Sequence, residues 1–128
     1  MGEAYQILVI DDESSVADAL RMILEDEGYS VALAATGSDG IELARRTSFN
    51  LIITDLRLPD MTGLDVLRAA LAADSRRPVI LITAQATPEI LDEARSLGAS
   101  AALSKPFLPS DILRLVIDIL TDETTSTH

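Results

Sequence analysis

The chain contains no cysteine and no tryptophan, and it has only two tyrosines, two phenylalanines and one histidine. Without cysteine, it can form neither a disulfide nor a thiolate metal site. The scarcity of aromatic rings argues against a platform on which nucleic acid bases stack. The single histidine, His128, is the last residue of the sequence. We expect it to be inert rather than a phosphate donor.

Basic residues are scarce as well. Ten lysines and arginines stand against 21 aspartates and glutamates, which leaves a formal charge of -11 over 128 residues. Such a surface repels the phosphates of nucleic acids, so we expect no direct binding to DNA or RNA. No apolar run approaches the roughly 20 residues of a membrane helix, and the first residues lack the basic region of a signal peptide. These absences predict a cytoplasmic protein without a membrane segment.

Short apolar runs alternate with helical patterns five times along the chain. The predicted strands are Tyr5–Ile10, Ser30–Ala35, Asn50–Thr54, Pro78–Thr83 and Ala99–Ser104. Several of these runs are unbroken rather than alternating, which is typical of parallel strands covered on both faces. Apolar residues at helical spacing follow each run. Because crossovers between parallel strands are right-handed, the pattern predicts an α/β fold with a doubly wound parallel sheet and five helices. We expect one domain over residues 1–122 and a disordered polar tail or linker start over residues 123–128.

Turn residues mark the ends of the predicted helices. Gly28 and Gly98 follow helical stretches, where a left-handed residue is favoured. Thr36 and Thr62 each begin a segment with the spacing of a capping box, and Thr87 is followed by a proline suited to the first helical position.

Polar side chains stand at the point where four of the predicted strands end. Asp11 and Asp12 follow the first strand, Asp55 the third, Thr83 closes the fourth and Lys105 follows the fifth. The carboxyl ends of parallel strands lie along one edge of the sheet, so these groups are expected to share one crevice. Carboxylates suit Mg²⁺, and an ammonium and a hydroxyl suit a phosphoryl group. The inventory predicts that Asp55 attacks phosphorus and becomes an acyl phosphate, with a cation neutralising the two anions.

Each of these residues also has a simpler interpretation. Asp11, Asp12 and Glu13 form a charged turn that suits a helix N-terminus, Asp55 suits a turn before a proline, and a lone lysine is usually a solvated surface charge. The order of the four segments is far more specific than any one of them. The step from Lys105 to Pro106 is a candidate for a cis peptide bond.

Taken together, these motifs resemble the receiver domain of bacterial two-component response regulators over nearly the whole chain. The matching segments are Asp11-Asp12, Asp55 to Gly63, Thr83-Ala84 and Lys105-Pro106-Phe107. The resemblance implies a flavodoxin-like, three-layer fold with five strands in the order 2-1-3-4-5. It also implies a phosphorylation-switched signalling module rather than an enzyme, one that catalyses only its own phosphoryl transfer and dephosphorylation.

The resemblance assigns a role to each site residue. Asp55 is implied to take a phosphoryl group from the phosphohistidine of a histidine kinase. Asp12 is implied to bind Mg²⁺ directly, Asp11 to assist, often through water, and the backbone carbonyl of Arg57 to complete the metal ligands together with Asp55. Thr83 and Lys105 are implied to contact the phosphoryl oxygens.

The implied partners are a sensor histidine kinase or phosphotransfer protein, and an output domain or a second copy that docks on the face of the fourth helix, fifth strand and fifth helix. One position departs from the family: Ala102 stands where most receivers carry tyrosine or phenylalanine. The aromatic rotamer that usually moves with the threonine cannot exist here, so the usual signal route does not apply. Arg57 and Gln85 flank the site at positions that influence loss of the phosphoryl group in the family.

Two other functions compete with this interpretation. A Mg²⁺-dependent phosphatase with an aspartate nucleophile would place its nucleophile after the first strand and a second aspartate two residues later, where this chain has Glu13. A flavin- or nucleotide-binding domain would need a glycine-rich loop after the first strand, and none is present. Sustained turnover of phosphate esters would favour the phosphatase.

Overall fold

The computed structural model describes residues 5–125 and contains one five-stranded parallel sheet in the order β2-β1-β3-β4-β5. The strands are β1 (Gln6–Ile10), β2 (Ser30–Ala34), β3 (Leu51–Asp55), β4 (Val79–Thr83) and β5 (Ala101–Ser104). Every predicted strand is present, with ends that differ by one or two residues. The predicted strand order and fold class are therefore confirmed.

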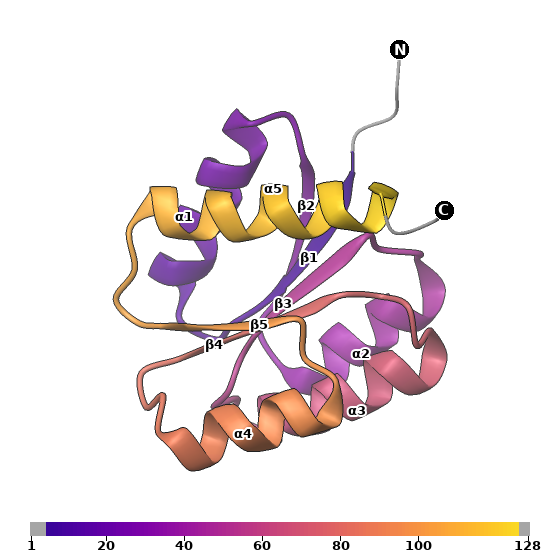
Figure 1. Ribbon diagram of the computed structural model, residues 1–128, viewed down its shortest axis with the longest axis vertical. Helices are drawn as coiled ribbons and strands as arrows, with labels where there is room; N and C mark the ends of the chain where they lie inside the picture. Colours follow the sequence, from indigo (N-terminus) through magenta and orange to yellow (C-terminus); the bar gives the residue numbers. More distant parts are fainter. Residues whose placement is uncertain (1–4, 126–128) are drawn as a thin grey trace.

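Five helices cover the sheet on both faces. They are α1 (Ser14–Asp26), α2 (Gly37–Arg46), α3 (Gly63–Ala73), α4 (Pro88–Leu97) and α5 (Pro109–Thr125). Figure 1 shows α1 and α5 on one side of the sheet and α2, α3 and α4 on the other, which gives three layers. Within the described residues, none of these helices is long and apolar enough to cross a membrane.

The strands feed two separate cores because successive side chains point to opposite faces. Ile7, Val9 and Ile53 are fully buried in a core that also contains residues of α1 and α5. Leu8 and Ile52, their neighbours in sequence, are fully buried in a second core with residues of α2 and α3. Burial on both faces explains why the central strands are unbroken apolar runs rather than alternating ones.

The predicted helix ends carry the expected caps. The Thr62 hydroxyl accepts from the backbone of Asp65, whose carboxylate accepts from the backbone of Thr62 in return, so the capping box is complete. Thr36 makes the corresponding threonine contact at the start of α2, and Thr87 caps α4 ahead of its proline. Gly28 and Gly98 have φ values of 95° and 105°, as expected of residues that end helices in the left-handed region.

The register of the strands sets the height of each polar residue at the carboxyl edge. Ile10 pairs with Thr54, so Asp11 and Asp55 follow at the same level, and Asp55 itself pairs with Ile82. Thr83 pairs with Ser104, so Lys105 leaves β5 about 7 Å farther along the strand direction than Asp55. The peptide bond between Lys105 and Pro106 is cis.

The C-terminal boundary differs from the predicted one. Helix α5 continues to Thr125, so residues 123–125 belong to a helix and not to the predicted tail. Helix ends fray over one or two residues, and the polar composition of this stretch does not mark the last turn. Residues 126–128, including His128, lie outside the described part of the chain. The domain division itself stays a prediction.

Candidate functional site

Three aspartates from two neighbouring strand ends form the centre of the site. Asp11 and Asp12 follow β1, and Asp55 is the last residue of β3. One carboxylate oxygen of each lies within 4.8 Å of the others, an arrangement that could hold a metal ion. Asp11 and Asp55 are buried, whereas Asp12 is exposed to solvent. The structure therefore brings together the three carboxylates that the sequence placed on separate segments.

The donor set of this cluster suits a hard divalent cation. All three donors are carboxylate oxygens. The buried Oδ2 of Asp11 accepts no backbone hydrogen bond and has the Lys105 ammonium 3.2 Å away. One ammonium does not neutralise three carboxylates, and a bound cation would offset the remaining negative charge. The cluster thus fits a cation by its chemistry and by its excess of negative charge.

The Asp55 carboxyl group resists ionisation. Burial raises its pKa above the ordinary value of 3.8, the charge of Asp11 raises it further, and the nearby Lys105 ammonium only partly offsets both effects. The positive charge that the protein places near Asp55 therefore does not fully offset the cost of ionising its carboxyl group. Additional positive charge in the cluster would stabilise the ionised form, which is the nucleophilic form.

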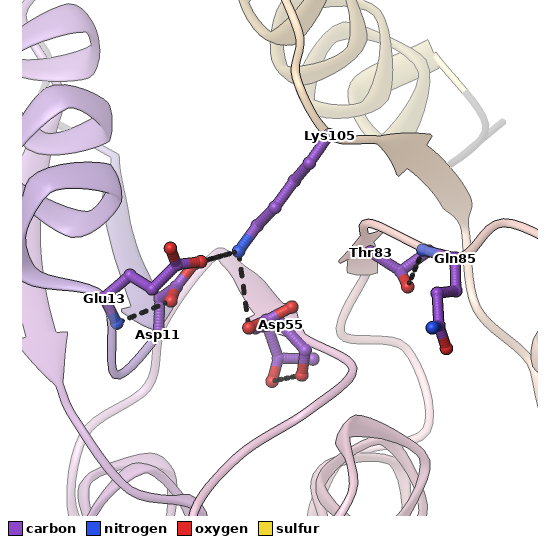
Figure 2. Close-up of polar contacts among 7 residues, drawn as sticks. Asp11, Glu13, Asp55, Thr83, Gln85 and Lys105 are labelled. Carbon is purple, nitrogen blue, oxygen red and sulfur yellow. Dashed lines mark hydrogen bonds and ion pairs between the residues drawn. The ribbon is translucent and has the colours of Figure 1, made fainter.

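The side chain of Lys105 enters the site from the end of β5. Its Nζ lies 2.8 Å from Glu13 Oε1, 3.2 Å from Asp11 Oδ2 and 3.3 Å from Asp55 Oδ2. Burial lowers the pKa of the ammonium, but its hydrogen bonds to Glu13 and Asp11 and the charges of Asp11 and Asp55 outweigh this effect, so the net shift is upward. Figure 2 shows the extended lysine reaching from the end of β5 toward Asp55.

Glu13 is a member of this site that the sequence analysis treated only as part of a charged turn. Its carboxylate makes the shortest contact with the ammonium of Lys105. The only signal in the sequence was its place directly after the acidic pair. That place fits a helix N-terminus equally well, so sequence alone did not separate the two roles.

The other wall of the site comes from the loops after β3 and β4. The Thr83 hydroxyl accepts a hydrogen bond from the backbone of Gln85 at 2.9 Å, and Arg57 Nη2 donates to Gln85 Oε1 at 2.6 Å. Figure 2 places Thr83 and Gln85 across Asp55 from Asp11 and Glu13. Arg57 thus ties the loop after β3 to the loop after β4 beside the site.

All these groups face an open crevice of about 410 Å³ at the carboxyl edge of the sheet. It is lined by Asp12, Glu13, Asp55, Arg57, Thr83, Ala84, Gln85 and Lys105. A second, smaller cavity, between the sheet and α2 and α3, is closed and mostly apolar and contains none of the predicted site residues. The crevice is large enough for a phosphoryl group, and its walls supply anionic, cationic and hydroxyl side chains in one place.

Ala102 lies in the middle of β5, partly buried against a small core formed by Leu56, Leu81 and Ala94. Its register partner on β4 is Leu81, two residues before Thr83. A methyl group is all that this position offers beneath the loop after β4. The structure therefore has no aromatic side chain that could move between buried and exposed rotamers here.

A model of the response regulator receiver domain matches residues 7–117 of this chain. Among curated proteins, the uncharacterized transcriptional regulatory protein YkoG of Bacillus subtilis is 34% identical over 98% of this chain and 55% of its own length. The DNA-binding response regulator MtrA of Mycolicibacterium paratuberculosis is 34% identical over 87% of this chain and 49% of its own length. The chain thus spans about half the length of the curated relatives that it matches.

Solved structures lead to the same family. The receiver domain protein of Methanospirillum hungatei, described as CheY-like, superposes with a TM-score of 0.94 at 32% identity and covers 97% of this chain and 99% of that one. The CheY4 chemotaxis protein of Vibrio cholerae superposes with a TM-score of 0.86 at 29% identity, over 91% of this chain and 99% of that one. With the family model, the relatives and the fold in agreement, the chain belongs to the response regulator receiver domains, the phosphorylation-switched signalling modules of two-component systems.

Proposed function

We propose that Asp55 is the residue that accepts the phosphoryl group in this receiver domain. The observation that supports this proposal is the contact of the Asp55 carboxylate with two opposite kinds of group. Carboxylates of Asp11 and Asp12 lie within 4.8 Å, and the ammonium of Lys105 lies 3.3 Å away. The acids provide a place for a cation, and the ammonium provides a second positive charge beside the Asp55 carboxylate.

The metal site of this proposal consists of Asp11, Asp12, Asp55 and the backbone carbonyl of Arg57. Mg²⁺ is the expected ion, because it prefers oxygen ligands and commonly uses one or two carboxylates with water. When bound, Mg²⁺ neutralises charge on the nucleophile and on the phosphoryl oxygens. The excess of carboxylates over the single Lys105 ammonium and the raised pKa of Asp55 both support a cation here.

The chemical step is a displacement at phosphorus. An oxygen of Asp55 forms a bond to the phosphorus atom while the bond from phosphorus to the donor nitrogen breaks, and the electron pair of that bond stays on the donor imidazole. In this proposal Lys105 and Thr83 bind the phosphoryl oxygens, the former as a point charge and the latter as a hydroxyl donor. Since Asp55 is part of the product, the domain acts only on itself, in its own phosphorylation and in the later loss of the phosphoryl group.

The donor is a phosphohistidine on a sensor histidine kinase or a phosphotransfer protein, and the protein acts in the cytoplasm. The acceptor crevice is open to solvent along the strand ends, as docking of a protein-borne donor requires. The output surface is the face of α4, β5 and α5, which binds an output domain or a second copy. Relatives of twice this length are described as transcriptional regulators or DNA-binding response regulators, which supports a DNA-binding output domain in the full protein.

Incubation with Mg²⁺ and acetyl phosphate tests this proposal. We expect one phosphoryl group per chain, stable in acid and labile in alkali, whose site is identified as Asp55 by mass spectrometry after borohydride reduction. Asp55→Asn should abolish the label, and Asp18→Asn, an exposed acid of α1 that contacts Arg21, should leave it unchanged. Labelling that persists in Asp55→Asn, or continued hydrolysis of varied phosphate esters, would contradict the proposal and favour the phosphatase.

A further inference from the structure

Lys105 is the single lysine of the chain, which otherwise takes its positive side chains from nine arginines. An ammonium group has three N–H donors. In this structure three carboxylates surround it, those of Glu13, Asp11 and Asp55, at 2.8, 3.2 and 3.3 Å. The capacity of the ammonium is therefore fully used before any phosphoryl group arrives.

Glu13 differs from the other two carboxylates. The side chains of Asp11 and Asp55 are 0% and 9% exposed, whereas that of Glu13 is 58% exposed. Glu13 is also not a member of the aspartate cluster that could hold a cation. Its carboxylate can thus leave the ammonium and return to water at little cost, which the buried pair cannot do.

Hydrogen bonds hold the backbone of Glu13 in place, whereas its side chain makes no capping hydrogen bond to its own helix. Its N–H donates to Asp11 Oδ1 at 2.9 Å, and its carbonyl accepts from Ala17 at 3.0 Å in the first turn of α1. Glu13 occupies the N-cap position of that helix, yet its side chain makes no cap hydrogen bond. The carboxylate instead contacts the ammonium of Lys105, which extends across the crevice to it, as Figure 2 shows.

We propose that Glu13 is a positioning residue that holds the Lys105 ammonium at the rim of the crevice in the unphosphorylated protein and releases it to the phosphoryl group. This inference rests on the proposed function of Asp55. In the resting state, Glu13 takes one of the three N–H donors of the ammonium and leaves the other two to the buried carboxylates of Asp11 and Asp55. In the phosphorylated state, a phosphoryl oxygen takes the donor that Glu13 gives up.

The uniqueness of Lys105 makes the proposal directly measurable. Chain labelled with ¹³C,¹⁵N-lysine gives one lysine side-chain signal in an NMR spectrum, and its Cε–Hε shifts report the surroundings of the ammonium. The spectra of the wild type, Glu13→Gln and Glu25→Gln are compared without ligand, and again with Mg²⁺ and beryllium fluoride as a phosphoryl mimic. Glu25→Gln is the matched control, because it removes the same charge from α1 about 18 Å farther along the helix.

We expect the effect of Glu13→Gln on the Lys105 signal to differ between the resting state and the state with the phosphoryl mimic. Without ligand, Glu13→Gln should shift the Lys105 signal, whereas Glu25→Gln should not. With Mg²⁺ and beryllium fluoride, the signals of the wild type and Glu13→Gln should converge, because the contact has been released. A difference of equal size in both states would mean a permanent ion pair and overturn the proposal, as would the absence of a difference in the resting state.

The same data separate this proposal from that of Asp55. If beryllium fluoride leaves the spectra of the wild type unchanged, the phosphoacceptor assignment fails. The resting-state comparison of Glu13→Gln with Glu25→Gln needs no phosphoryl mimic, so it tests the Glu13 contact in either case.

Discussion

The replacement of Asp55 by asparagine should stabilise the fold in the absence of divalent cations. Asparagine has the shape of the protonated aspartate. It removes the negative charge of a carboxyl group whose pKa is raised by burial and by the charge of Asp11. The same change should remove most of the stabilisation that Mg²⁺ gives to the wild type. An active-site charge that costs stability is expected where a protein keeps a site ready for a ligand.

The magnitude follows from the contacts of Asp55. Its carboxylate has two aspartate oxygens within 4.8 Å and an ammonium at 3.3 Å. At an effective dielectric constant of about 20, each repulsion amounts to about 3.5 kcal/mol and the attraction to about 5 kcal/mol. The two acids together outweigh the ammonium by about 2 kcal/mol. Water screens the exposed Asp12, whereas burial of the Asp55 carboxylate adds to the cost of its charge. We therefore expect a gain of about 1 kcal/mol for Asp55→Asn, or roughly 3–5 °C in Tm.

The assay is urea or thermal unfolding of both proteins in EDTA, at pH values from 4 to 8, and again with Mg²⁺. The folded-state pKa of Asp55 lies above its ordinary value of 3.8. The folded wild type therefore retains its proton longer than the unfolded chain does, and its stability falls as the pH rises through that window. Asp55→Asn lacks this fall. Mg²⁺ at 100 times its Kd should add about 2.7 kcal/mol to the wild type and much less to the variant.

Two results would refute this reasoning. One is an Asp55→Asn variant that is no more stable than the wild type in EDTA at pH 7, which would mean that Lys105 compensates the carboxylate fully. The other is an equal gain from Mg²⁺ in both proteins, which would place the cation elsewhere. Asp18→Asn, which removes an exposed charge that contacts Arg21, serves as the control for a general effect of net charge.

Two further predictions concern the scaffold of the site. Gly63→Ala should destabilise the fold by about 1–3 kcal/mol in urea unfolding. The added methyl group would collide with the carbonyl oxygen of Asp55 and lie 3.0 Å from the Cα of Leu56. An unchanged unfolding midpoint would contradict this prediction. Arg57→Ala and Gln85→Ala should each change the rate at which phosphorylated protein loses its label. The double variant should show about the same change as either single variant, because the two side chains form one hydrogen bond at 2.6 Å. Additive effects would show that they act separately.

The fold was largely predictable because its signals are local and repeated. Unbroken apolar runs such as Leu51–Ile53 indicated buried parallel strands, and Thr62, Thr87 and Gly98 indicated helix ends through the special backbone needs of those positions. The boundaries were less accurate, as the end of α5 at Thr125 shows. The last turn of a helix depends on what it packs against, and the sequence of the segment itself does not contain that information.

The convergence of the site residues was also accessible, since strand ends of a parallel sheet must share an edge. The contacts between them were not. Nothing local to Glu13 indicates that its carboxylate would contact Lys105, 92 residues later, rather than cap its own helix. Arg77 is a similar case: its side chain is buried and donates to the carbonyl of Ala44, although an arginine in the loop between α3 and β4 would ordinarily be assigned to the surface.

The register of the sheet explains why a long side chain suits position 105, and the proposed exchange of partners favours lysine over arginine. Asp11 and Asp55 stand at one level, and the chain leaves β5 two residues farther on, so the side chain must reach back over about 7 Å to meet them. A long flexible stem with a compact charge can do this and can still shift between carboxylates and phosphoryl oxygens, whereas the planar fork of arginine favours one fixed bidentate contact. The nine arginines of the chain lie at other positions, and its one lysine stands at the point where we propose that the charge moves between partners.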